Sequence, residues 1–234
     1  MNLWQRRDFQ LAAGETLRPG GLDLTRRGLD LCRRHCGLAR QARVLDLGCG
    51  AGATLRMLAE EGYRAFGLDR HSPAFRTGAV LLADVMRPPF ADGAMDALVC
   101  ECVLSLLPSP QTALEEWRRV LRPGGALLLT EFYICGGIAG FRACRPEPAP
   151  RAASCLDGAR LAAEWNALLA RAGFLLRTFE DHSAALARMA ARLVWYGQPD
   201  LPDVFGLARP GGTCRTRYGY GLWIAQKETP CTLS

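Results

Sequence analysis

Between Asp46 and Gly52 the chain reads Asp-Leu-Gly-Cys-Gly-Ala-Gly, directly after a short apolar stretch. Glycines at the end of a strand let the backbone turn tightly and approach a bound nucleotide-like ligand. The spacing of Gly48, Gly50 and Ala53 also satisfies the dinucleotide fingerprint, in which the loop holds a pyrophosphate at a helix N-terminus. The loop alone therefore predicts a nucleotide-like ligand and leaves its identity open.

Three aspartates narrow the choice of ligand. Asp46 lies two residues before the first glycine, where a carboxylate is unfavourable beside a pyrophosphate and favourable near a cation. S-adenosylmethionine (SAM) carries both a sulfonium and an ammonium group. Asp69 follows a second apolar stretch and can accept hydrogen bonds from two ribose hydroxyls, and Asp84 follows a third and can accept one from an adenine amino group. Together with the glycine loop, they predict an adenosyl amino acid bound at one edge of a sheet.

The elements that must position these residues alternate along the chain. Strands are predicted at residues 43–47, 64–68, 80–83, 95–100, 126–131, 174–180 and 218–226. Helices are predicted from Asp23 or Thr25 to about Cys36, at 53–61, from Ser72 for a short stretch, and at 110–120, 157–172 and 182–196. Continuous apolar strands that alternate with helices predict a parallel sheet covered on both faces.

Residues 43–131 resemble the class I SAM-dependent methyltransferases, in particular the type 11 methyltransferase domain family. The motifs that carry this likeness lie in order at 44–52, 67–69, 83–84, 89–99 and 121–125. The resemblance implies an α/β fold, a Rossmann-like, doubly wound and mostly parallel sheet of about seven strands. The last strand, 218–226, is then antiparallel, and a helical extension precedes the core.

The resemblance also implies SAM as the cofactor and a set of binding residues. These are Asp46, Gly48, Cys49, Gly50, Gly52, Asp69, Arg70, Asp84, Val85 and Glu101. SAM supplies most of the activation for methyl transfer, so the protein mainly orients the nucleophile and excludes water. The catalytic base is not identified, and Glu101, Glu131, Tyr133 and His182 are the candidates near the carboxyl edge. The family usually places histidines after the fourth strand, whereas residues 101–107 here read Glu-Cys-Val-Leu-Ser-Leu-Leu.

Length and composition indicate one domain over residues 1–234. It divides into the N-terminal helical extension (1–42), the SAM-binding core (43–131) and a C-terminal half (132–234). Within that half, residues 136–154 are rich in glycine and proline, which predicts a lid loop over the site.

Charge and hydropathy favour a soluble, cytoplasmic protein with a small-molecule partner. The net charge is +6, but the arginines are scattered in pairs, which argues against a nucleic-acid partner. The N-terminal residues lack the apolar region of a signal peptide, and the most apolar windows are too short to cross a membrane. The ten cysteines match no disulfide framework, and no metal site is assigned.

We therefore predict a SAM-dependent methyltransferase that acts on an unidentified small-molecule acceptor. One alternative is a SAM-binding regulatory or assembly protein without catalysis. Another is a thiol or metalloid methyltransferase, because Cys32 and Cys36 share a helix face and Cys100 and Cys102 bracket Glu101. A nicotinamide-dependent oxidoreductase is disfavoured by the aspartates that precede the loop and end the third strand. The oligomeric state is not predicted.

Overall fold

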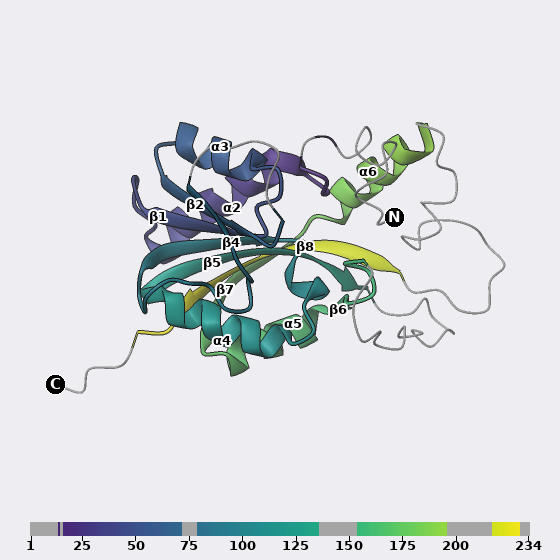
Figure 1. The fold of residues 1–234 in the computed structure, drawn as a ribbon. Coiled ribbons are helices and arrows are strands. Elements are labelled where there is room, and N and C mark those ends of the chain that lie inside the picture. The colour runs from purple at the N-terminus through teal and green to yellow at the C-terminus, as the bar shows by residue number, and fades with distance from the viewer. Residues whose placement is uncertain (1–13, 15, 72–78, 136–153, 196–216, 230–234) are drawn as a thin grey trace.

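One mixed sheet forms the centre of the computed structural model, which describes residue 14 and residues 16–71, 79–135, 154–195 and 217–229 (Figure 1). The strand order is β3-β2-β1-β4-β5-β8-β7, and β6 pairs with β5 off this path. All pairs are parallel except those of β8, which runs antiparallel to β5 and to β7. The strands are β1 (Arg43–Leu47), β2 (Arg64–Asp69), β3 (Ala79–Leu82), β4 (Met95–Glu101), β5 (Leu121–Ile134), β6 (Arg160–Leu161), β7 (Phe174–Asp181) and β8 (Tyr218–Lys227).

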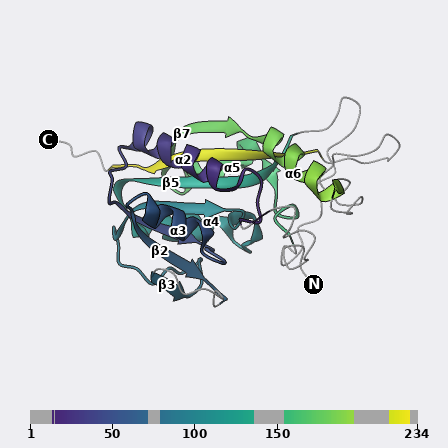
Figure 2. The same cartoon turned by 90° about the horizontal axis from the view of Figure 1, so that it is seen from above.

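Helices cover both faces of the sheet, as Figures 1 and 2 show. The first face carries α2 (Gly21–Cys36), α3 (Ala53–Glu60) and α6 (Ser183–Trp195), and the second carries α4 (Pro110–Val120) and α5 (Ala162–Arg171). A short 3₁₀ helix, η2 (Leu104–Leu106), follows β4. Within the described residues, no helix combines the length and the hydropathy needed to cross a membrane.

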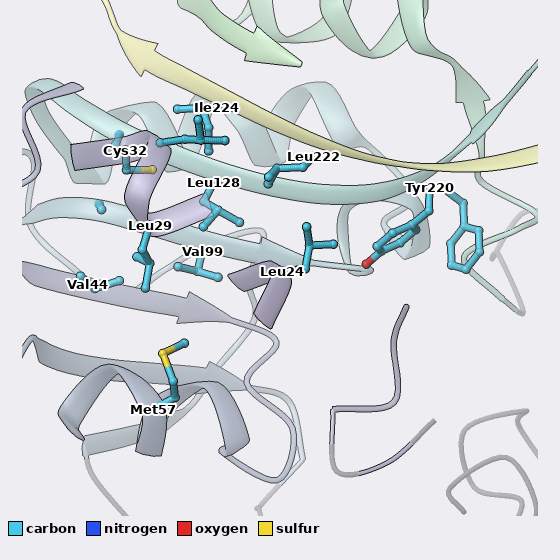
Figure 3. Packing of buried hydrophobic residues seen from close by; sticks show 14 of the residues in the cluster. Leu24, Leu29, Cys32, Val44, Met57, Val99, Leu128, Tyr220, Leu222 and Ile224 are labelled. Atoms are coloured by element: carbon cyan, nitrogen blue, oxygen red, sulfur yellow. The ribbon is translucent and has the colours of Figure 1, made fainter. Parts of the chain in front are cut away.

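Helix α2 belongs to the core although it precedes the first strand. Its side chains Leu24, Leu29 and Cys32 are buried against the sheet, where Val44 and Leu128 face them (Figure 3). Gly28 allows this approach, because a Cβ there would overlap the side chain of Leu128. The start of α2 lies beside the carboxyl edge of the sheet, where the hydroxyl of Thr25 contacts Glu101.

The predicted strands are all present, and the antiparallel last strand is confirmed. The helix predicted from Asp157 was wrong at its start, since α5 begins at Ala162. The Asp157 carboxylate instead accepts hydrogen bonds from the N–H and hydroxyl of Ser154, which holds a turn before β6. The short helix predicted at Ser72 and the predicted lid loop, apart from its last residue, lie outside the described residues.

Candidate functional site

A pocket of about 440 Å³ opens at the carboxyl ends of β1, β2 and β4. Because β1 lies between the other two, Asp69 at the end of β2, Asp46 in β1 and Glu101 at the end of β4 follow one another across this edge. Asp46 is in register with Gly67 on one side and with Val99 on the other. The strand order therefore gathers three acidic residues that are far apart in the sequence.

The glycine loop forms one wall of this pocket. The N–H groups of Gly48 and Cys49 donate to the carbonyl oxygen of Leu68, at 2.7 and 3.2 Å, so the loop is tied to β2. Gly48 has a φ of 76°, and a Cβ there would lie 2.5 Å from a methyl carbon of Val103. Gly50 has a φ of 50°, and no atom lies within 4 Å of the position that its Cβ would take. The backbone at Gly50 is thus open to a ligand.

The Asp69 carboxylate lines the pocket beside the loop. Its two oxygens accept hydrogen bonds from the backbone N–H groups of Gly50 and His71, both at 2.9 Å. A carboxylate has about four acceptor positions, so these two bonds leave capacity for hydroxyl donors of a ligand. The side chain is oriented before any ligand arrives.

Asp46 is almost completely buried, with 4% of its surface exposed. Burial, reinforced by the nearby Glu101 carboxylate, raises the pKa of Asp46 to about 8, although Arg18 acts in the opposite direction. The site therefore disfavours a second negative charge at Asp46 until a cation approaches. This electrostatic arrangement suits a positively charged ligand group and opposes a phosphate.

Glu101 is held by three side chains from outside the core strands. An Nη2 of Arg18 forms an ion pair with its Oε2 at 2.6 Å. The hydroxyls of Thr25 in α2 and Thr54 in α3 donate to its two oxygens, at 2.9 and 3.3 Å. The same Nη2 of Arg18 also donates to these hydroxyls, at 2.6 and 3.1 Å. A closed network thus joins the N-terminal segment to the carboxyl edge of the sheet.

The residues of this network that lie outside the sheet are not predicted by any pattern in the sequence. Arg18 lies in the turn Leu-Arg-Pro-Gly-Gly at 17–21, and nothing in that turn distinguishes it from the other arginines. Thr54 follows the glycine loop, which was the one available signal. The contacts depend on the path of α2 across the sheet, which a single sequence does not specify.

Most residues predicted to bind the cofactor line the pocket together. Those present in the lining are Asp46, Gly48, Cys49, Gly50, Asp69, Arg70, Val85 and Glu101. Gly52 and the Asp84 side chain are not among the lining residues. The N–H of Gly52 closes the loop on the Cys49 carbonyl at 2.8 Å, and Asp84 accepts a hydrogen bond from the N–H of Met86 at 2.9 Å. The role of Asp84 toward an adenine stays a prediction.

Comparison with known proteins agrees with this geometry. Residues 45–129 match the family model described as "Methyltransferase domain". The matched segment begins in β1 and ends in β5, so it contains the glycine loop and the ends of β1, β2 and β4. The segment is similar to a methyltransferase domain, and the match covers 85 of the chain's 234 residues.

Two curated relatives match part of this chain, and the chain spans less than half the length of each. A human "Thiol S-methyltransferase TMT1B" is 37% identical over 110 residues, which cover 41% of this chain and 44% of that protein. A "Demethylmenaquinone methyltransferase" of Corynebacterium urealyticum is 35% identical over 100 residues, covering 41% of this chain and 44% of that protein.

A solved structure extends the likeness over the fold. The phosphoethanolamine N-methyltransferase 2 of Haemonchus contortus, in complex with S-adenosyl-L-methionine, has a TM-score of 0.68 at 15% identity. The match covers 95% of this chain and 56% of that one. The elements outside residues 45–129 therefore also share the fold of that protein.

The candidate bases of the methyltransferase domain lie in different surroundings. Glu101 lines the pocket and is already paired with Arg18. Tyr133 lies outside the lining, in edge-on ring contacts with Phe179 and Trp223. His182 also lies outside it, with Nε2 at 3.1 Å from a carboxylate oxygen of Glu180. A catalytic role for any of the three stays a prediction.

Glu131, the fourth candidate, is fully buried and lies outside the pocket lining. Its oxygens accept hydrogen bonds from the N–H of Ser105 at 3.1 Å and from its hydroxyl at 2.7 Å. Burial raises the pKa of Glu131 to about 7, against the effect of these hydrogen bonds. The contacts fix η2, which leads into the pocket-lining residues Leu106 and Leu107.

The described cysteines lie in the core or in the pocket lining, except for Cys135, which is exposed. Cys32 and Cys36 belong to α2 and are buried in the core, where burial raises the pKa of each thiol. Cys102 and Cys155 line the pocket, and Cys102 lies 3.1 Å from the hydroxyl of Tyr220. A hydrogen bond with Cys155, together with burial, raises the pKa of Cys102. Among the residues that the structure describes, no group of three or more His, Cys, Asp or Glu is arranged to hold a metal ion.

Proposed function

We propose that this chain binds SAM and transfers its methyl group to a small-molecule acceptor. The observation that carries the proposal is the succession of Asp69, Asp46 and Glu101 along one sheet edge, beside a glycine loop with open space at Gly50. SAM has a ribose, a cation and an amino-acid end in a matching order. The family match over residues 45–129 supports the same cofactor.

The residues present fit this cofactor in two respects. A Cβ at Gly50 would project into empty space, as expected where a backbone approaches a ligand. Asp46 and Glu101 face the pocket with Arg18 as their positive neighbour, so the site can accept an ammonium group and is unfavourable for a pyrophosphate. The same features argue against a nicotinamide dinucleotide.

In the proposed mechanism, SAM supplies the electrophilic methyl carbon. Asp69 accepts hydrogen bonds from the ribose hydroxyls, and the carboxylates of Asp46 and Glu101 stabilise the positive end of the cofactor. Phe132, Leu156 and Met189 line the pocket with apolar surface and help to exclude water from the reacting centre. The chain thus contributes binding, orientation and desolvation to the reaction.

Two measurements test this proposal. Calorimetry should detect binding of SAM and of S-adenosylhomocysteine, its demethylated product, and should detect much weaker binding of NADH. Tighter binding of NADH than of S-adenosylhomocysteine contradicts the cofactor assignment. Binding without turnover, in a screen of radiolabelled methyl transfer to cell extract, favours the regulatory or assembly alternative.

The names of the two relatives suggest which acceptors to test first. One relative is named for thiols and the other for demethylmenaquinone, so a thiol and an apolar quinone form the first pair. Metalloids are added separately, because thiols of this chain line the pocket. Methylation of only one of these acceptors identifies the chemical class of the substrate.

A further inference from the structure

Two cysteine thiols from distant parts of the sequence meet in the wall of the pocket. Cys102 follows the end of β4, and Cys155 lies in the turn before β6. Both residues are partly buried and both line the pocket. Their side chains share a hydrogen bond. Neither thiol takes part in the proposed mechanism, so the contact between them is left to be explained.

The thiol of Cys102 is held in place from the side of the core. Its Sγ lies 3.1 Å from the hydroxyl of Tyr220, which donates to the hydroxyl of Thr130 at 2.9 Å. Because a phenol has one hydrogen, the Cys102 thiol is the donor to Tyr220, and its sulfur accepts from Cys155. The backbone of Cys102 has a φ of 58°, which is unfavourable for a residue with a Cβ, and its N–H donates to the Thr130 carbonyl oxygen at 2.9 Å. These contacts fix the Cys102 sulfur at the pocket.

The segment that carries Cys155 is packed against the segment that follows Cys102. A Cβ at Gly158 would overlap the carbonyl oxygen of Ser105, so the two backbones are in direct contact. The turn at 154–157 is closed by its own hydrogen bonds. Contact of backbone on backbone therefore brings the two thiols together, and they do not depend on flexible side chains to meet.

We propose that Cys102 and Cys155 form a redox-active pair, which reacts with low-molecular-weight disulfides and closes to a reversible intramolecular disulfide in the wall of the pocket. A disulfide needs Cβ atoms about 3.5–4.5 Å apart, and thiols in hydrogen-bond contact reach this geometry by rotation of their side chains. The bond ties the turn at 154–157, which contributes to the pocket lining, to the end of β4. The inference goes beyond the proposed function, because the thiol chemistry needs no SAM.

The exchange has two steps. The Cys155 thiol loses its proton, and its sulfur attacks one sulfur of the small disulfide, whose S–S bond breaks to release a small thiolate that takes up a proton. The Cys102 sulfur then attacks the sulfur of Cys155, and the second small thiol leaves with the proton of Cys102. The two cysteines together lose two electrons, and the small disulfide is reduced to two thiols. Cys155 reacts first because the raised pKa of Cys102 disfavours its thiolate.

The competing explanation is that both thiols serve only as small apolar side chains. Both also pack against the core cluster beneath α2, which is consistent with that role. An accessible thiol without a partner in reach forms a mixed disulfide with the small molecule and stops there. The two explanations therefore differ in the product that the same oxidant gives.

The test treats the reduced full-length chain with oxidised glutathione, blocks the remaining thiols with N-ethylmaleimide and digests the protein with trypsin. Cys100 and Cys102 share the tryptic peptide 77–118, and Cys155 lies in the peptide 152–160. We expect these two peptides to be joined, in about 10-fold excess over peptide 152–160 that carries glutathione, because the effective concentration of a neighbouring thiol is high. Dithiothreitol should separate them again. Cys155 that keeps glutathione without a cross-link, or that does not react, overturns the proposal.

Two variants identify the partner within peptide 77–118. Cys102→Ser should abolish the cross-link and leave Cys155 with one glutathione. Cys100→Ala is the matched control, because Cys100 lies two residues away, is fully buried and is not among the residues that line the pocket. It should form the cross-link as the wild type does. A cross-link that survives in Cys102→Ser overturns the proposal.

A measurement on the wild type keeps the test decisive even if Cys102→Ser does not fold. The same reaction is carried out in concentrated urea, where the ten cysteines of the chain meet without native packing. Closing the long loop between Cys102 and Cys155 is then opposed by chain entropy, so the yield of this cross-link should fall several-fold. Fragmentation of the joined peptides shows whether Cys100 or Cys102 carries the bond. An equal yield in the folded and the unfolded chain, or a bond at Cys100, overturns the proposal.

Discussion

The backbone N–H of Gly50 donates a 2.9 Å hydrogen bond to an oxygen of Asp69, so the carboxylate at the end of β2 also holds the glycine loop. The other oxygen accepts from the N–H of His71. Loop and carboxylate thus act as one unit. A ligand that hydrogen-bonds to Asp69 contacts a glycine loop that is already ordered. The entropic cost of ordering the loop therefore does not reduce the binding free energy.

Asp69→Ala should therefore weaken S-adenosylhomocysteine binding by about 1.5–3 kcal/mol, the scale for losing hydrogen bonds to a charged group. The free energy of unfolding should change much less, since the residue lies at a pocket surface and not in the core. Asp92→Ala is the control, because that aspartate is exposed and pairs with Arg119 at the surface. Affinity within twofold of the wild type would show that Asp69 does not hold the ribose.

The raised pKa of Asp46, about 8, predicts that cofactor binding releases a proton. Without ligand the carboxyl is largely protonated below pH 8, and an approaching ammonium or sulfonium favours its ionised form. Affinity should then rise with pH toward 8 and level off above it. The groups that face Asp46 are Glu101, Arg18 and Asp69.

Calorimetry in two buffers of different ionisation enthalpy counts the protons released. Asp46→Asn should abolish both the proton release and the rise of affinity toward pH 8, because the amide does not titrate. Wild-type affinity that stays constant from pH 6 to 8, or proton uptake, would contradict this role of Asp46.

The local sequence pattern was sufficient to predict the strands and helices of the parallel part of the fold. The strand at 43–47 and the helix at 110–120 match the structure at both ends, because an apolar run followed by glycines and a proline at a helix start are local signals. β5 is longer than predicted, since Leu121–Gly125 continues the strand past a register shift opposite Met95 and Ala97. β6 was missed, because two residues that pair with a distant strand leave no periodic pattern.

The residues of the candidate site likewise include some that a local pattern predicted and one that it did not. The glycine loop, Asp69 and Asp46 were predicted because each lies within or directly after a short apolar strand. Arg18 was not predicted, because its place in the pocket depends on the docking of α2, for which Gly28 provides the close contact. Long-range packing of this kind cannot be predicted from the spacing of residues in the sequence.

Because of the buried carboxyl of Glu131, the free energy of unfolding should decrease as the pH rises from about 4.5 to above 7. Its folded pKa, about 7, exceeds the ordinary value of 4.5 because the carboxyl is buried. The stability that the protonated form contributes is complete below the unfolded pKa and is lost as pH rises through the folded one. In this pH range Glu131→Gln should reduce the decrease in the free energy of unfolding by up to about 1.4 kcal/mol per pH unit, which is the value for one linked proton.

Chemical denaturation at pH 5, 6, 7 and 8 measures that slope, with Glu228→Gln as an exposed control that should follow the wild type. Asp46 also has a raised pKa, so it too lowers the free energy of unfolding as the pH rises. Some pH dependence of stability therefore remains in Glu131→Gln. If the variant and the wild type lose stability in parallel over the whole range, the buried carboxyl at Glu131 is not the linked group.

Gly50→Ala should abolish cofactor binding at a small cost in stability. The added methyl meets no protein atom within 4 Å and projects into the space assigned to the ligand. Its remaining cost is the left-handed backbone, with a φ of 50°, which for a residue with a Cβ is about 1–2 kcal/mol. Gly62→Ala is the matched control, because Gly62 has a φ of 86°, also has no atom within 4 Å, and follows α3 away from the pocket. Thermal unfolding should therefore show similar losses for both variants, whereas calorimetry with S-adenosylhomocysteine should show a loss only for Gly50→Ala. Equal affinities in the two variants would mean that the ligand does not approach the loop at Gly50, and the glycine there would then serve the turn alone.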